Sequence, residues 1–154
     1  MTNRAFVLET MKRSGKLAAQ ALQSRSSEMT GTELNAEIAY IPDFKAACAK
    51  LNMLDRQVGF VCKTSTGRVV RLLQPYDSTI HTQEPEEFSD PWVFLWSTDP
   101  ANALPFVAIA NSPYNTGDCC SDGGVVYRSN VDGNTLSPAA RADAWSVCTG
   151  GVEQ

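Results

Sequence analysis

The chain has 154 residues, of which 43% are apolar and 19% are charged, with a formal net charge of −4. This length fits one ordinary domain or two very small ones, which excludes a large multidomain enzyme, and the apolar content disfavours general disorder. The longest apolar run outside the termini, residues 104–110 with Pro105 in it, is far shorter than the roughly 18 residues that span a membrane. Glu9 and Lys12 stand where a secretory signal needs an apolar stretch. We therefore expect no membrane segment and no export by that route.

The cysteines do not form a recognisable framework. Five cysteines are an odd set, and two of them, Cys119 and Cys120, are neighbours that strain usually keeps from pairing with each other. No two of them show the C-x-x-C spacing of a zinc site. We therefore expect small apolar core residues in a reducing compartment, with no metal and no cofactor.

Candidate catalytic residues are few. The single histidine, His81, stands in a polar stretch, and the sequence holds no nucleophile elbow, zinc-binding helix, phosphate loop or dinucleotide turn. Glu84, Glu86 and Glu87 lie in an acidic run broken by a proline, which is typical of a solvated loop. The sequence therefore predicts that the protein is not an enzyme, since catalysis would need an acid-lined cleft around His81.

Proline and charge divide the chain near residue 40. None of the eight prolines precedes Pro42, and residues 1–25 hold five bases and one acid. That first part carries a charge of +4, which leaves −8 for the rest of the chain. These shifts predict four parts: an anchoring helix at 1–25, a linker at 26–39, a first β-module at 40–100 and a second at 101–150.

The first part has the pattern of an amphipathic helix over residues 3–23. Its apolar stripe consists of Leu8, Met11, Ala18 and Leu22. Gly15 interrupts the stripe, and an isolated helix of this length is only marginally stable in water. We therefore predict that these four residues serve oligomerisation or docking on a partner surface.

Short elements follow the first proline. Residues 43–51 have the spacing of a brief helix, and alternating or β-branched runs predict strands at residues 58–63, 69–73, 92–96, 105–109 and 125–129. Glycine-containing turns separate these runs. The expected fold is mainly β, with an N-terminal amphipathic α-helix followed by two small antiparallel β-modules.

The two modules are related by an internal repeat. Each copy reads as a glycine turn, a strand, a glycine-rich hairpin, a second strand, a loop and a tryptophan strand. The matched pairs are Gly59 with Gly117, Gly67 with Gly124, and Trp92 with Trp145. The offset between copies shrinks only across loops, as expected for a duplicated β-module, because loop length is cheap to change.

The second copy carries a resemblance to a known family. Its residues Tyr114, Gly117, Asp118, Gly124, Tyr127, Asn134, Ser137, Pro138 and Trp145 resemble the pattern of the small chitin-binding module of carbohydrate-binding families 5 and 12. The resemblance covers about residues 32–148. Together with the preceding helix, the order of helix, first module and second module is similar to that of tailed-bacteriophage structural proteins with two divergent modules of this type.

This resemblance implies a structural component on the surface of a bacteriophage virion. It would be a head fibre or capsid decoration, or part of a tail fibre, assembled in the host cytoplasm and attached to capsid or tail proteins through its N-terminal helix. We expect a homo-oligomer, with a trimer as one candidate symmetry. The sequence pI near 4.9 disfavours nucleic acid as a partner, and we expect no membrane contact.

The alternative is a glycan-binding module that adheres to the host surface. Chitin-binding members place exposed aromatic rings just after the second strand, where copy one offers Tyr76 and copy two offers no aromatic residue. Tyr76 and Tyr114 each follow a proline, and we expect both to be exposed. They are the candidates for contact with a sugar or a partner protein.

Overall fold

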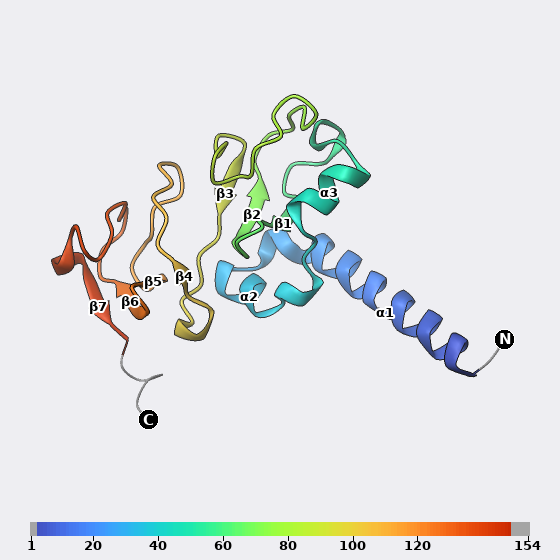
Figure 1. The fold of residues 1–154 in the computed structure, drawn as a ribbon, viewed down its shortest axis with the longest axis horizontal. Helices are drawn as coiled ribbons and strands as arrows, with labels where there is room; N and C mark the ends of the chain where they lie inside the picture. Colours follow the sequence, from blue (N-terminus) through green and yellow to red (C-terminus); the bar gives the residue numbers. More distant parts are fainter. Residues whose placement is uncertain (1–2, 149–154) are drawn as a thin grey trace.

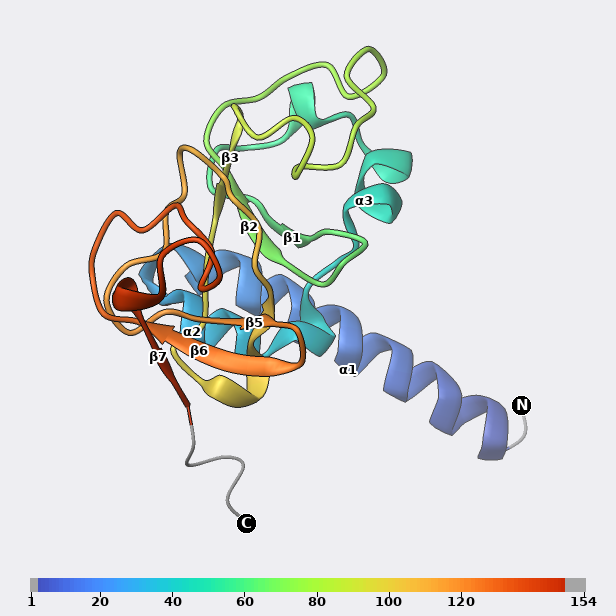
Figure 2. The same ribbon diagram turned by 60° about the vertical axis from the view of Figure 1, so that its left-hand side comes forward.

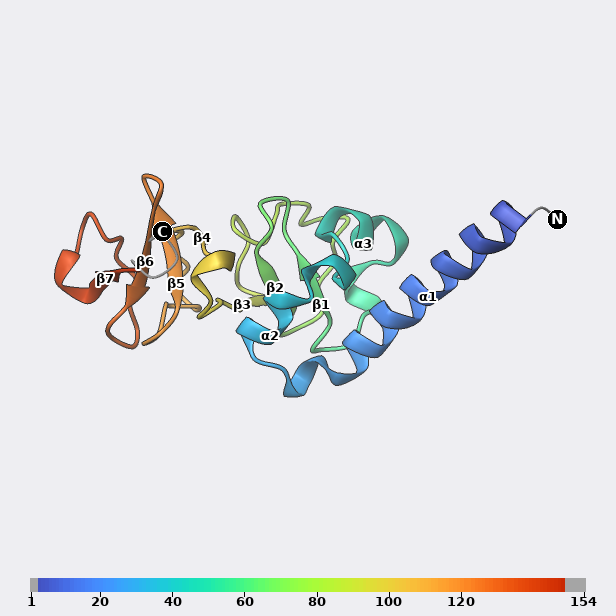
Figure 3. The same cartoon turned by 90° about the horizontal axis from the view of Figure 1, so that it is seen from below.

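The computed structural model describes residues 3–148, except for the side chains of residues 3–6 and of Leu8. A long helix, α1 (Asn3–Arg25), projects from one end of a body that contains two β-sheets, and the second sheet forms the other end (Figure 1, Figure 3). The other elements in chain order are η1 (Ser26–Glu28), α2 (Gly31–Ala36), η2 (Ile38–Tyr40), α3 (Phe44–Lys50), η3 (Met53–Asp55), β1 (Val61–Lys63), β2 (Val69–Leu72), β3 (Trp92–Phe94), η4 (Pro100–Asn102), β4 (Leu104–Pro105), β5 (Cys119–Asp122), β6 (Val125–Ser129), η5 (Ala142–Ala144) and β7 (Trp145–Val147).

The balance of secondary structure differs from the expectation. The protein is about 33% helix and 19% strand, so the mainly β class is not confirmed. The predicted N-terminal helix is confirmed, and it continues to Arg25. The predicted helix at 43–51 is also present, as α3. Helix exceeds strand because α1 alone has 23 residues, whereas the longest strand, β6, has 5.

The first sheet consists of β1, β2 and β3, paired antiparallel in that order. Val69 of β2 packs with residues of α1 and α2, whereas the next residue, Val70, packs with residues of α3. Figure 2 shows α3 and α1 on opposite sides of these strands. Both faces of this sheet are thus covered, which explains why consecutive residues of β2 are apolar.

Residues 26–39 are ordered, which corrects the expectation of a linker. Thr30 and Glu33 form a capping box in which each side chain accepts a hydrogen bond from the other residue's backbone N–H. Leu34 of α2 is fully buried. A Cβ on Gly31 would lie 2.2 Å from the Trp96 carbonyl oxygen, so glycine allows this close approach. Thr30, Glu33 and Gly31, within the predicted linker, are therefore capping and packing residues.

The second sheet has the order β4, β5, β6, β7. β5, β6 and β7 pair antiparallel, but β4 pairs parallel with β5 and has only two residues. The strand predicted at 105–109 is therefore wrong beyond Pro105. The chain leaves the sheet there because Phe106 packs near Trp145 in the second sheet's core, whereas Ile109 is buried in the core of the first.

The two sheets share a local pattern at their matched glycines. Gly59 has φ of 99° and Gly117 has φ of 98°. Gly59 N donates to the Leu72 carbonyl at 2.8 Å, and Gly117 N donates to the Ser129 carbonyl at 2.9 Å. Leu72 then pairs with Trp92, as Ser129 pairs with Trp145. Each glycine therefore starts the same strand, hairpin and tryptophan-strand arrangement.

Aromatic stacking and one arginine join the two sheets. The Trp96 ring stacks on Tyr114 with centroids 4.2 Å apart, and its other neighbour is Phe94 of β3 at 5.6 Å. Arg68, in the β1–β2 hairpin, donates to the Pro105 carbonyl of β4 at 2.6 Å. The module boundary predicted near residue 100 falls in η4, between the sheets.

Candidate functional site

The predicted stripe on α1 is divided between the body and solvent. Leu22 is fully buried, Ala18 is half-buried and Met11 is 64% exposed. Leu8 lies in α1, but its side chain is outside the described residues. The base of the stripe is therefore part of the protein's own core, and only its outer portion can serve docking or oligomerisation.

The outer turns of α1 expose apolar side chains. Val7, Met11 and Leu17 are exposed by 52%, 64% and 59% respectively. Figures 1 and 3 show this part of the helix extending away from the body. Because isolated helices of this length are marginal in water, these turns would gain stability from a partner surface.

Gln23 fixes the base of α1 to the edge of the first sheet. Its side-chain amide Nε2 donates to the Val61 carbonyl at 2.7 Å, and its Oε1 accepts from Val61 N at 3.0 Å. The amide thus replaces a neighbouring strand along β1. Arg71 of β2 adds a hydrogen bond to the Ser26 carbonyl at 2.7 Å. These contacts set the direction in which α1 leaves the body.

An open groove of about 670 Å³ lies between α1 and the body, and we name it the α1 groove. It is lined on the α1 side by Gly15, Lys16 and Ala19, and on the body side by Tyr40, Lys50 and Phe60. The fold brings these residues together from three separate stretches of the sequence. The surface of the groove is largely apolar, and its lining includes the cationic residues Lys16, Lys50 and Arg56.

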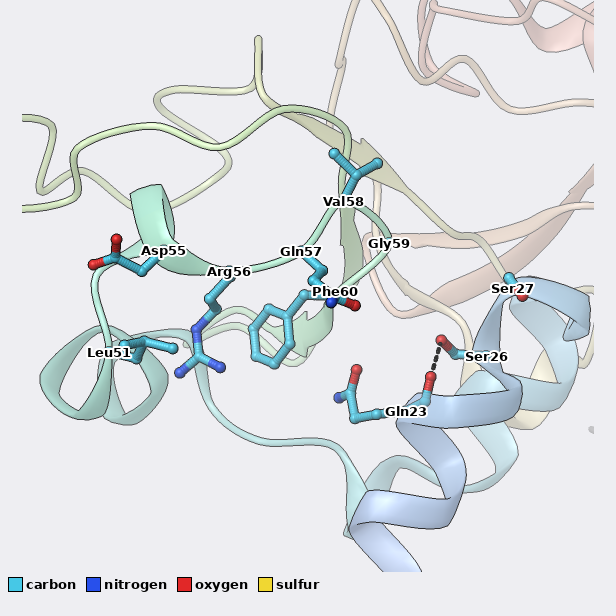
Figure 4. Close-up of a pocket in the computed structure, with 10 residues that line it drawn as sticks. All are labelled: Gln23, Ser26, Ser27, Leu51, Asp55, Arg56, Gln57, Val58, Gly59 and Phe60. Atoms are coloured by element: carbon cyan, nitrogen blue, oxygen red, sulfur yellow. Dashed lines mark hydrogen bonds between the residues drawn. The ribbon is translucent and has the colours of Figure 1, made fainter.

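A second groove, of about 470 Å³, shares Gln23, Arg56 and Phe60 with the α1 groove and extends to Ser26 and Leu51 (Figure 4). The Arg56 guanidinium lies over the Phe60 ring, 4.1 Å from its centroid, and donates to the Ala47 carbonyl at 2.8 Å. Burial lowers the pKa of Arg56 from its usual value. Its Nε atom is buried and has no hydrogen-bond partner among the described residues. Arg56 is therefore a partly desolvated cation between the two grooves.

Both candidate tyrosines are core residues, so the expectation that they are exposed is wrong. Tyr76 is 8% exposed and accepts a hydrogen bond from the Trp92 indole at 3.3 Å. Burial raises its pKa to about 12. Tyr114 is 2% exposed, stacks on Trp96, and has its pKa raised by burial. The prolines before them mark loops, but the rings turn inward, where each buries a large apolar area.

The chemistry-bearing residues elsewhere are dispersed. The exposed His81 ring stacks on Phe88, with centroids 4.5 Å apart, and lies outside both grooves. Over residues 3–148, no three His, Cys, Asp or Glu side chains lie together as a metal site. The five cysteines are free, and burial raises the pKa of Cys120 to about 12 and that of Cys119 to about 11. Cys119 and Cys120 are therefore poor nucleophiles at neutral pH.

Comparisons with known proteins add no relatives: no family model, curated protein or solved structure matches the chain. None of the described helices combines the length and the apolar content that a membrane span requires. The functional interpretation therefore depends on the sequence resemblance and on the geometry of α1 and its grooves.

The groove residues were missed at the sequence level. Lys16 was counted in the basic first part, and Lys50 in a brief helix, but nothing in their local patterns places them near Phe60. The glutamine that bonds to β1 also has no sequence signal, because one polar residue on a helix is ordinarily solvated. Only the three-dimensional course of the chain assembles this site.

Proposed function

We propose that this protein is a non-enzymatic structural component on the surface of a tailed-bacteriophage particle, attached to capsid or tail proteins through α1. It would serve as a head fibre, a capsid decoration or part of a tail fibre, and act as a homo-oligomer. In this proposal the two sheets are β-modules related by an internal repeat, which the shared pattern at Gly59 and Gly117 supports.

The observation that carries the proposal is the projection of α1. A helix that leaves its own body and exposes Val7, Met11 and Leu17 has the form of an attachment element, because amphipathic helices commonly bind by placing apolar side chains in a partner's groove. Its fixed base supports the same role. The hydrogen bonds of Gln23 to Val61 hold the helix at a defined angle to the body.

Glycan binding is the weaker candidate. A sugar ring stacks on a free aromatic face, but Trp96 lies between Phe94 and Tyr114, and Tyr76 packs edge-on against Phe88 and Trp92. These rings use their faces for one another. Trp96, Tyr76 and Tyr114 therefore favour a structural role over a sugar-binding one.

The test is incorporation into particles. Phage particles that lack the native chain would be supplied with the full chain, with Met11→Glu/Leu17→Glu, or with a control, Gln83→Glu/Thr135→Glu, that adds the same charge at exposed sites elsewhere. We expect the full chain and the control in gradient-purified particles, detected by immunogold labelling, and the α1 variant only in the soluble fraction.

Two results would contradict the proposal. Absence of the full chain from purified particles would refute the virion role itself. Normal incorporation of the folded α1 variant would show that attachment uses another surface of the protein. Circular dichroism of each purified variant verifies that the body remains folded.

A further inference from the structure

The lining of the α1 groove combines apolar surface with unbalanced positive charge. Ala19, Tyr40 and Phe60 supply apolar surface, and the exposed side chains of Lys16 and Lys50 supply positive charge. No aspartate or glutamate is among the described residues that line it. The groove therefore has a defined chemical preference, for a ligand that is apolar on one side and anionic on the other.

The cations of the groove lack anionic partners within the protein. Lys16, Lys50 and Arg56 form no ion pair with any residue of the described part of the chain, whereas Lys45 and Lys63 each do. Arg56 is the most constrained of the three, since it is half-buried, lies over the Phe60 ring and lines both grooves. An incoming carboxylate could form charge-assisted hydrogen bonds with a guanidinium in this position.

We propose that the α1 groove binds an acidic amphipathic segment of a partner protein. The segment places its apolar side chains on Phe60 and the small residues of α1, and its carboxylates near Lys16, Lys50 and Arg56. This inference rests on the proposed attachment through α1 and names the chemistry of the partner at that site. Gly15 lacks a side chain and Ala19 has only a methyl group, which allows a helical segment to approach α1 closely.

Charge excludes the closest alternative occupant, the α1 helix of a second copy. Residues 1–25 carry a charge of +4, so a second α1 would bring like charge to Lys16 and Lys50. Nucleic acid would leave the apolar lining uncovered and would meet a chain of net charge −4. An acidic amphipathic protein segment would match both the apolar lining and the cations.

The test measures binding of a synthetic probe to the full chain. The probe is a fluorescent peptide with leucine at positions i, i+3, i+4 and i+7 and glutamate elsewhere, and its control replaces every glutamate with lysine. The groove variant is Lys16→Glu/Lys50→Glu. The matched control, Arg13→Glu/Arg141→Glu, makes the same charge change at exposed cations outside the groove.

We expect fluorescence anisotropy to show binding of the acidic peptide and not of the basic one. The groove variant should weaken this binding by at least about tenfold relative to the matched control, and added salt should weaken it further. A similar affinity of both variants would overturn the proposal, because the peptide would then bind elsewhere. Equal competition by a single-stranded oligonucleotide would overturn it in favour of general polyanion binding.

Two further results separate this inference from the proposed function. If sedimentation shows self-association that the groove variant abolishes, the occupant is a second copy and the partner assignment is overturned. If Met11→Glu/Leu17→Glu fails to enter particles while Lys16→Glu/Lys50→Glu enters normally, attachment through α1 stands and the groove is not its docking site.

Discussion

Leu22→Ala tests whether the base of α1 is part of the core. Leu22 is fully buried among Leu34, Ile41, Val61 and Val69, on the α1-facing side of the first sheet. Truncating a fully buried leucine to alanine costs about 2–5 kcal/mol, from lost apolar transfer and the cavity left behind. Against a typical stability of about 5–15 kcal/mol, this is a large loss.

Urea unfolding followed by circular dichroism measures the effect. A loss near 3 kcal/mol in the free energy of unfolding would also lower the melting temperature, by roughly 6–12 °C for a chain of this size. Met11→Ala is the control, because the Met11 side chain is 64% exposed on the same stripe and its loss should change stability by less than about 0.5 kcal/mol. The reasoning is refuted if Leu22→Ala is as stable as that control.

Other substitutions test the fold and the pH dependence. Gly59→Ala and Gly117→Ala should each lower the free energy of unfolding, measured with urea, by about 1–2 kcal/mol, because φ angles of 99° and 98° strain an L-residue. Clearly unequal losses would contradict the shared pattern. Two opposing causes act on the pKa of Glu86. Burial raises this pKa, but hydrogen bonds from two threonines and Arg68 outweigh burial and hold it below its usual value. The stability that the Glu86 carboxylate contributes is therefore present above about pH 4.3 and is lost as the pH falls below that value. The urea midpoint of the unmodified chain should fall over this pH range, and Glu86→Gln should make that fall smaller. Tyr76→Ala should lower the free energy of unfolding by about 3–5 kcal/mol, because the ring is buried. Calorimetry should detect no chitin-oligomer binding by the unmodified chain, and micromolar binding by that chain would favour the glycan-binding function.

Local signals predicted several elements correctly. The periodicity of residues 3–23 predicted α1, and the β-branched run before Ser129 predicted β6 with its observed bounds. The glycines that the repeat pairs, Gly59 and Gly117, have matching positive φ angles, because a turn that needs a left-handed residue selects glycine in both copies. Such features depend on a few consecutive residues.

Features that depend on distant residues were not predictable. The apolar stripe on α1 does not distinguish Leu22, which is buried in the core, from Met11, which is exposed to solvent, because both are apolar and share one helix face. Deleting residues 1–25 as a dispensable anchor would therefore remove Leu22 and Gln23 from the folded body. Prolines suggested exposed tyrosines, but ring burial is decided by the cores on either side of the loop.

The contact between Gln23 and β1 also bears on solubility. An edge strand presents unpaired N–H and C=O groups that can recruit a strand from another molecule. On the outer edge of β1, Gln23 occupies both backbone groups of Val61, and Lys63 N donates to the Pro42 carbonyl at 2.9 Å. Release of the helix base would uncover the backbone groups of Val61 on this edge while the rest of the sheet is still folded. Variants that loosen α1 should therefore aggregate through β1 before the protein unfolds globally.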